Sequence, residues 1–190
     1  MAAPRLGPAI ALAIAVALNA ACAGPRSTSG PTQPGAAPSS MPDVTARPAT
    51  PPPTSFSSTV LPYAVVLPAD WLELSTSGEE EVYESADLRW TLAIGTGHPE
   101  PGQTVEDRVR INRESEFANC ETEPERDRPV TVGGERGILW DFTCGTISGL
   151  AANTIHSGVG YRLTLRSYGH AADGLEALMA GILATFTFTE

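Results

Sequence analysis

The sequence predicts an α+β domain in which two helices pack on an antiparallel sheet to form a layered sandwich. Several segments alternate apolar and polar residues, and glycine-containing turns separate some of them, which is typical of strands joined by hairpins. Such strands favour antiparallel pairing. Two further segments begin with helix-capping residues, and helices packed on an antiparallel sheet give a layered architecture.

The predicted strands begin with a β-rich segment, Tyr63–Leu67, which Pro68 stops. Gly133-Gly134 and Ser157-Gly158 are turn signals, and each lies between two alternating segments. A short alternating segment with Phe186 and Phe188 closes the chain. The predicted strands cover residues 63–67, 89–94, 129–132, 138–144, 151–156, 161–166 and 186–188.

Two helices are predicted. Thr104 can cap the first, and the acidic residues after it favour the positive end of a helix that runs to about Phe117. Its apolar face is thin and consists of Val105, Val109 and Ile111. Asp173 is expected to cap the second helix, with Glu176 in the capping-box position. The second helix carries an apolar stripe at helical spacing, made of Leu175, Leu178, Met179, Ile182 and Leu183.

The amino terminus is predicted to be a signal peptide over residues 1–21. A short segment with one charge, Arg5, precedes the apolar run Ala9–Leu18, and small residues follow that run. The run is shorter than the ~20 residues that a permanent transmembrane helix needs. We therefore expect export from the cytoplasm.

The segment Leu18-Asn19-Ala20-Ala21-Cys22 resembles a bacterial lipobox, with Asn19 where the usual pattern has leucine. The resemblance implies that Cys22 becomes the first mature residue and carries a lipid that anchors the protein to the outer face of the membrane. The alternative is ordinary cleavage after Ala23, at the small-residue pattern 21–23, which would release a secreted protein.

Residues 22–55 are predicted to be a disordered stalk, and residues 56–190 a single domain. Nine of the seventeen prolines lie between Pro25 and Pro53, with serine, threonine and alanine between them. Such a segment buries too little apolar area to offset its ordering entropy. The alternative is a proline-rich ligand, but the run Pro51–Pro53 has no flanking basic residue.

The three cysteines have different expected roles. An exported protein folds in an oxidising compartment, where two cysteines of one domain usually pair, so Cys120 and Cys144 are predicted to form a disulfide. Metal ligation and a reactive thiol remain as alternatives for this pair. Cys22 is left over at the position where lipid attachment would use it.

The charge of the predicted domain disfavours several partners. All twelve basic residues of the chain are arginine, and the domain has nine of them against twenty-one acidic residues, a net charge of −12. Such a field repels nucleic acid and anionic lipid headgroups. The run Glu79–Glu81 is interpreted as a solvated loop edge rather than a cation site.

No pattern in the sequence identifies a catalytic, metal or cofactor site. The three histidines, His98, His156 and His170, lack the spacing of zinc ligands. We expect His98 and His170 to lie in exposed loops and His156 near the end of a strand. The segment Gly145–Gly149 is not the Gly-x-Ser-x-Gly motif of hydrolases, because its serine comes one residue late.

Three segments carry a family resemblance. They are Tyr63 with Leu67-Pro68-Ala69-Asp70-Trp71, the hairpin Val132–Gly137, and Gly181–Phe186. Together they resemble PsbP/Mog1-like domains, and within that fold the actinobacterial LpqN-type lipoproteins. The resemblance implies a binding or scaffold role, because members of this fold mostly dock on other proteins, and it assigns no catalytic residue.

Two functions follow as hypotheses. The first is a non-catalytic envelope lipoprotein that binds an envelope protein or an apolar ligand between sheet and helix, which predicts an exposed apolar patch or a dry cavity. The second is a secreted hydrolase or accessory enzyme that uses His98 or His156, which predicts a histidine within hydrogen-bond reach of a carboxylate in a cleft.

Overall fold

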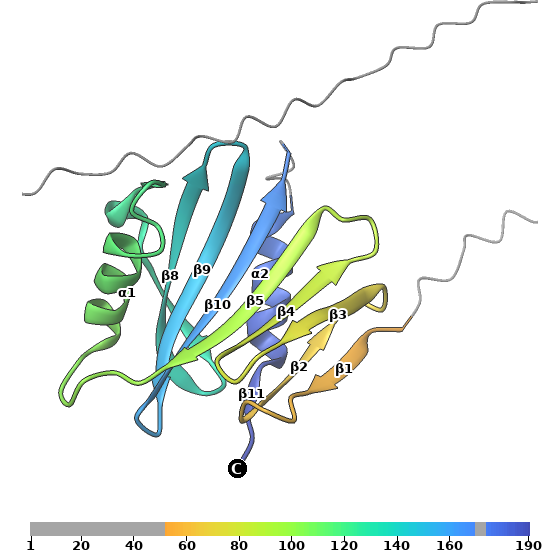
Figure 1. Cartoon of the computed structure of the whole chain (residues 1–190), viewed down its shortest axis with the longest axis horizontal. Helices are drawn as coiled ribbons and strands as arrows, with labels where there is room; N and C mark the ends of the chain where they lie inside the picture. Colours follow the sequence, from red (N-terminus) through yellow and green to blue (C-terminus); the bar gives the residue numbers. More distant parts are fainter. Residues whose placement is uncertain (1–51, 170–173) are drawn as a thin grey trace, which may run out of the picture. The chain divides into compact units, whose positions relative to one another are not determined.

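A computed structural model describes residues 52–169 and 174–190 of the chain, and this part forms two antiparallel sheets and two α-helices (Figure 1). The fold class predicted from the sequence is confirmed. The bounds are β1 Thr54–Ser57, β2 Tyr63–Leu67, β3 Trp71–Thr76, β4 Glu80–Ser85, β5 Trp90–Gly97, α1 Val105–Glu114, β6 Glu121–Thr122, the 3-10 turn η1 Pro124–Arg126, β7 Arg128–Val132, β8 Glu135–Cys144, β9 Ile147–His156, β10 Val159–Tyr168, α2 Leu175–Thr185 and β11 Thr187–Phe188.

The larger sheet has eight strands in the order β3-β4-β5-β10-β9-β8-β6, and β7 also pairs with β8. Most neighbours are hairpin partners, as the turn signals predict. There are two exceptions. Strand β6 pairs with β8 although β7 lies between them in sequence, and the central strands β5 and β10 are joined although α1 and four strands lie between them. The smaller sheet joins β2 to β1 and to the final strand β11.

The two predicted hairpin turns have the backbone that tight hairpins require. Gly133 and Gly134 have φ values of 58° and 90°, and Ser157 and Gly158 have 49° and 77°. Positive φ at both central residues is the type I′ geometry, whose twist matches that of the flanking strands. These turns fix the registers of β7 with β8 and of β9 with β10.

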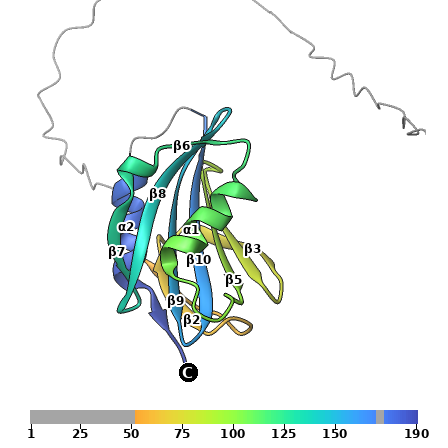
Figure 2. The ribbon, with the colours of Figure 1, turned by 90° about the vertical axis from the view of Figure 1, so that its left-hand side faces the viewer.

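The larger sheet is covered on both faces (Figure 2). On one face, α2 and the smaller sheet bury a large cluster around Tyr63, Leu163 and Met179. On the other face, α1 contacts β8 and β9 and buries a smaller cluster, in which Val109 and Phe117 pack beside Trp140. The alternation along the strands supplies both clusters, because successive side chains point to opposite faces.

The helices confirm most of the predicted pattern. The stripe on α2 is buried at Leu175, Met179, Ile182 and Leu183. The cap predicted at Asp173 lies outside the described residues, and the amino-terminal cap of α2 is Gly174, which makes no side-chain cap hydrogen bond.

In α1, Thr104 and Asp107 form a reciprocal capping box. The prediction that this helix reaches Phe117 is wrong, because the helix ends at Glu114. The Ser115 hydroxyl donates back to the Ile111 carbonyl at 2.7 Å. The chain then turns so that the Phe117 ring packs on the Trp140 and Phe142 rings.

The interpretation of Glu79–Glu81 as a solvated loop edge is wrong for Glu81. Strand β4 was not predicted, and its alternation points Glu81 into the large core cluster, where the residue is 2% exposed. The carboxylate accepts hydrogen bonds from the hydroxyls of Ser58, Tyr63 and Tyr83. Three hydroxyl donors offset part of the cost of removing this group from water.

The folded part begins with β1 at Thr54, two residues before the predicted start of the domain. The predicted signal peptide and Cys22 lie outside the described residues. Among residues 52–169 and 174–190, no helix has the length and the apolar composition needed to cross a membrane.

Candidate functional site

The outer face of α2 is apolar and made of small residues. Ala177, Ala180, Gly181 and Ala184 are exposed there, and we call these four residues the α2 face. The only charged residue of the helix is Glu176 in its first turn, which pairs with Arg128 across 2.9 Å. The surface of an otherwise strongly charged domain therefore has an uncharged stretch along this helix.

Two apolar grooves flank the α2 face. The β7 groove, of about 400 Å³, lies between α2 and β7 and is lined by Val130, Thr131, Gly133, Gly134, Ala180, Leu183, Ala184 and Phe186. The β2 groove, of about 310 Å³, lies between α2 and β2 and is lined by Pro53, Val66, Leu67, Pro68, Ala177, Leu178, Gly181, Ile182 and Thr185. Small exposed residues between two grooves let a partner surface approach the helix backbone closely.

A second site lies where two hairpin turns meet the final strand. His156, the last residue of β9, has its Nδ1 2.9 Å from Oε1 of Glu135, the first residue of β8. The Oγ of Ser157 lies 3.3 Å from His156 Nε2. The imidazole stacks on the ring of Phe188, with centroids 4.0 Å apart and planes 2° from parallel. The stacking and the carboxylate hold the histidine ring in one orientation.

These residues border a pocket of about 650 Å³, which we call the hairpin pocket. Its lining consists of Pro62, Gly133, His156, Ser157, Val159, Tyr161, Thr187, Phe188, Thr189 and Glu190. Gly133 lines both this pocket and the β7 groove, so the two depressions adjoin. The His156 side chain is 33% exposed, and the site is therefore open to water.

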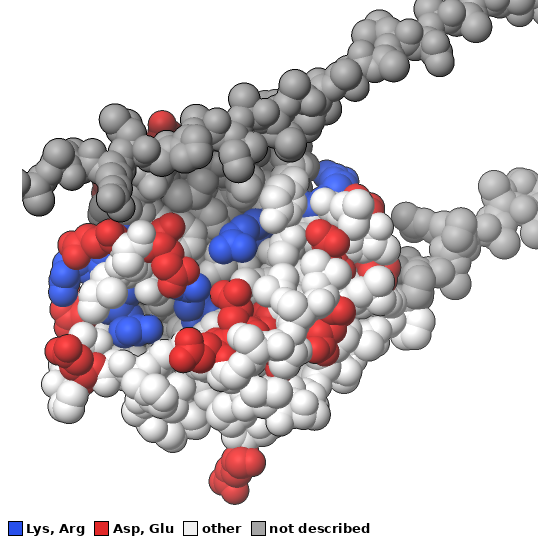
Figure 3. Space-filling view, in the orientation of Figure 1, with Lys and Arg blue, Asp and Glu red and all other residues white. Residues whose placement is uncertain are grey.

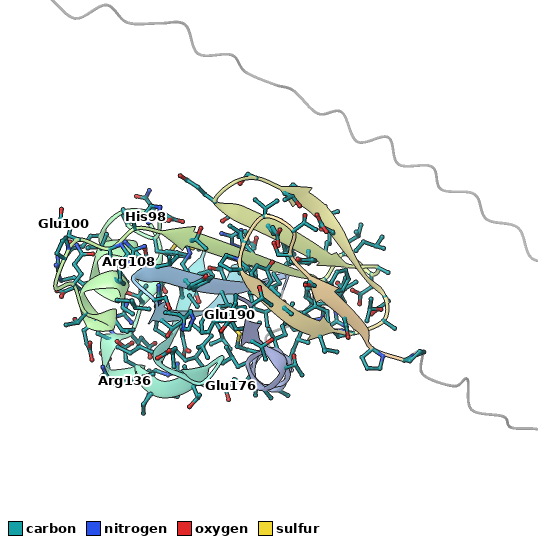
Figure 4. All side chains as sticks on the ribbon, turned by 90° about the horizontal axis from the view of Figure 1, so that it is seen from below. His98, Glu100, Arg108, Arg136, Glu176 and Glu190 are labelled. Carbon is teal, nitrogen blue, oxygen red and sulfur yellow. A yellow bond between two sulfur atoms is a disulfide. The ribbon has the colours of Figure 1, made fainter. Side chains whose placement is uncertain are left out.

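The structure separates the histidines that the sequence singled out. His98 is exposed in the loop after β5, as predicted, and Figure 4 shows it near Arg108 at the α1 end of the domain. His170 lies outside the described residues. Within residues 52–169 and 174–190, no three His, Cys, Asp or Glu side chains gather as metal ligands would.

Sequence reasoning missed Glu135 as the partner of His156, because neither predicted turn joins β8 to β9. Both turns place these residues at the same end of the β8–β9 hairpin, where Gly137 pairs with Thr154. Extending that register by two residues brings Glu135 opposite His156. The α2 face was also missed, although its small residues occupy the helix positions outside the predicted apolar stripe.

Cys120 and Cys144 form a disulfide with a Cα–Cα distance of 4.5 Å, which is within the usual range. The bond ties the chain after α1 to the end of β8. Both residues pack against the smaller core cluster under α1. The bridge therefore holds α1 and its connecting chain on this face of the sheet, away from α2.

The elements and their order define a PsbP/Mog1-like α+β fold, and solved structures share it. The solution structure of cyanobacterial PsbP (CyanoP) from Synechocystis sp. PCC 6803 has a TM-score of 0.56 and 14% identity, covering 72% of this chain and 92% of that chain. A point mutant of Mog1 has a TM-score of 0.56 and 6% identity, with 73% and 97% covered.

The structure of LpqN, which is involved in cell envelope biogenesis of Mycobacterium tuberculosis, has a TM-score of 0.51 and 13% identity, covering 75% of this chain and 88% of that chain. At these identities the likeness concerns the fold alone. No protein-family model and no curated protein sequence matches the chain.

Proposed function

We propose that the protein is an exported envelope lipoprotein, anchored through Cys22, whose domain binds a protein partner through the α2 face and catalyses no reaction. The observation that carries this proposal is the uncharged outer face of α2 between two apolar grooves. Exposed apolar patches of this kind mark interaction sites in soluble domains.

The geometry suits a protein better than a free small molecule. The β7 and β2 grooves are shallow and lie on either side of one helix, so a ligand small enough for one groove would leave the other empty. A partner surface with two large apolar side chains would fill both grooves and cover the four small residues between them. The domain net charge of −12 favours a basic rim on that partner.

The predicted location supports the same proposal. A lipid anchor and the proline-rich segment before Thr54 would confine the domain near other envelope proteins, which raises its effective concentration toward them. A weak affinity of the domain for its partner would then be sufficient for binding. LpqN shares the fold and is involved in cell envelope biogenesis of Mycobacterium tuberculosis, which is consistent with this location.

The docking test uses a photo-crosslinking amino acid at Ala180 in living cells, followed by mass spectrometry. The matched control places the same amino acid at Glu114, which is also an exposed helix position but lies on α1 at the other face of the sheet. We expect a discrete crosslinked protein from position 180 only. Equal crosslinking patterns from both positions would argue against a specific α2 partner.

A charge on the α2 face should abolish the crosslink. Ala180→Arg adds a long charged side chain to the contact without touching the buried stripe of α2, and we expect binding about tenfold weaker or worse. Because position 180 now carries the arginine, the photo-crosslinking amino acid is placed at position 184, on the same side of the helix. Undiminished crosslinking by Ala180→Arg would refute docking at this face.

The anchor has an independent test. Cys22→Ser removes the sulfur that would carry the lipid, so we expect the variant to appear in the medium rather than in the detergent phase. Detergent partitioning of the two proteins measures this. A variant that remains with the membrane fraction would contradict lipid attachment at Cys22.

A second candidate function is hydrolysis at the hairpin pocket, because Ser157, His156 and Glu135 form a hydrogen-bonded chain in the order of a nucleophile, a base and an orienting acid. A fluorophosphonate probe tests it. Labelling that is lost in Ser157→Ala and in His156→Gln would establish an activated serine. Absence of labelling in the native protein leaves the histidine as a structural residue stacked on Phe188.

A further inference from the structure

A polar pocket lies on the opposite face of the sheet from α2. It has a volume of about 300 Å³ and lies between α1 and strands β4, β5 and β10. Figure 3 shows acidic and basic side chains gathered on this face of the domain. We call it the arginine pocket, and its lining residues are Ser77, Glu79, Glu80, Gly95, Thr96, Arg108, Glu116 and Arg162.

The two arginines of the pocket differ in their partners. Arg162 is paired, with Glu116 in hydrogen-bond contact and Glu80 at 3.7 Å. The Arg108 side chain extends from α1 and forms no ion pair or hydrogen bond with any described residue. The buried Nε atoms of Arg108 and Arg162 both have no partner, but only Arg108 has no partner for its whole guanidinium. Buried donors in folded proteins are nearly always satisfied, so an unpaired one at a pocket requires an explanation.

The sheet beneath Arg108 is shaped to receive its guanidinium. Gly97 and Gly160 are directly opposite each other in β5 and β10. A Cβ atom on Gly97 would lie 2.9 Å from Arg108 Nη2, and one on Gly160 would lie 3.1 Å from Nε. Glycine weakens a strand and often marks a close approach by another group. Two paired glycines therefore make room for a side chain that gains no partner within the described protein.

The charges of the pocket restrict what Arg108 can bind. Arg162 forms ion pairs with the carboxylates of Glu80 and Glu116. The Glu79 carboxylate has no ion-pair partner among the described residues. The pocket thus presents one unpaired cation and one unpaired anion. A simple cation is opposed by two guanidinium groups, and a multiply charged anion such as phosphate is opposed by three carboxylates.

We propose that the arginine pocket binds a free amino acid. The α-carboxylate pairs with the guanidinium of Arg108, and the α-ammonium faces the carboxylate of Glu79. Both charges of the ligand are then matched. A pocket of about 300 Å³ is at the small end of the range for ligand sites, which suits a molecule of this size.

The test is isothermal titration of the mature chain with L-alanine and L-glutamate, and with acetate, methylammonium and inorganic phosphate as separate probes. We expect at least one amino acid to bind and to bind more tightly than any of the three simple ions. Equal or tighter binding of acetate or phosphate would overturn the zwitterion assignment. Failure of both amino acids to bind would overturn the proposal.

Three variants locate the binding. Arg108→Gln should weaken the amino acid about tenfold to a hundredfold, the effect of losing one charge-assisted pair. Glu79→Gln should weaken it too but should not weaken acetate, because the carboxylate that is removed repels an anion. Arg110→Gln is the matched control, because this exposed arginine of the same helix pairs with Asp107 and Glu114 outside the pocket.

The variants must also fold for the comparison to count. Circular dichroism and the thermal unfolding midpoint of Arg108→Gln are expected to match those of Arg110→Gln, because neither change removes a buried apolar contact. Binding that survives in a folded Arg108→Gln variant would refute the site. Binding that is lost equally in the Arg110→Gln control would refute it as well.

Discussion

Alkaline pH is expected to destabilise the domain through its buried tyrosines. Tyr63 and Tyr83 are 0% and 1% exposed, and their hydroxyls hydrogen-bond to the buried carboxylate of Glu81. Burial, together with the neighbouring carboxylate, raises the pKa of both phenols above the ordinary value of 10.0. Burial alone raises the pKa of Tyr161.

The direction of the effect follows from proton binding in the two states. In the unfolded chain a phenol releases its proton near pH 10, whereas in the folded domain the raised pKa keeps it protonated. Above pH 10 the unfolded state therefore binds fewer protons, and the free energy of unfolding falls as the pH rises. Below pH 10 both states are protonated, and the full stability is present.

The free energy of unfolding is expected to fall by about 1.4 kcal/mol for each of Tyr63 and Tyr83 between pH 8 and pH 11. Tyr63 and Tyr83 together give a loss of about 3 kcal/mol, a large share of the stability of a typical domain, and Tyr161 adds to the loss in the same direction. The chain contains no lysine, since all twelve basic residues are arginine. No lysine ammonium therefore contributes to the pH dependence in this range.

The assay is denaturant unfolding followed by tryptophan fluorescence, at intervals from pH 8 to pH 11. Tyr83→Phe keeps the ring that packs on Phe56 and removes one titrating hydroxyl. We expect the decline in the free energy of unfolding to be smaller by about 1.4 kcal/mol in this variant. Each variant is compared with its own value at pH 8, so the hydrogen bond lost at neutral pH does not enter.

Tyr168→Phe is the matched control, because Tyr168 is 43% exposed and its removal should leave the pH dependence unchanged. An unaltered decline in Tyr83→Phe would refute the assignment of alkaline instability to the buried tyrosines. So would an equal change in both variants, because the effect would then not depend on burial.

Three further outcomes can be measured by the same unfolding assay at neutral pH. Replacing Cys120 and Cys144 together by alanine opens a loop with a sequence separation of 24 and should cost about 3 kcal/mol. Gly149→Ala should cost about 1–3 kcal/mol, because its Cβ would lie 2.1 Å from the Phe142 ring. Gly181→Ala should stabilise α2 by about 0.5–1 kcal/mol, because nothing lies within 4 Å of its Cβ. Losses below half of the first two values, or destabilisation by the third, would contradict the packing described here.

Local signals account for the parts of the fold that the sequence predicted. The stripe of α2 recurs at the helical period, and the Ser157-Gly158 turn supplies the positive φ values of a hairpin. Strand β2 has the predicted bounds because alternation and Pro68 both mark its end. Each of these features depends on residues close together in the chain, so periodicity and turn chemistry are sufficient to find them.

Strand β3 is an element that the local signals of the sequence did not predict. Its residues Trp71–Thr76 are exposed after the first one, and a register shift between Glu73 and Ser75 interrupts its pairing with β4. An edge strand of this kind has no buried face along most of its length and so has no clear alternation to detect. Its existence depends on β4, and β4 depends in turn on its pairing with β5.

The sequence by itself determined the α+β class, the turns, the helices and the candidate cysteines, because these follow from neighbours in the chain. Only the tertiary structure decided that Glu81 is buried, that His156 meets Glu135, and that the outer face of α2 lies between two grooves. It also brought β10 beside β5, and with it the glycine pair beneath Arg108. The physical reason is that pairing between distant strands fixes these contacts, and no local period of the chain records which strands will become neighbours.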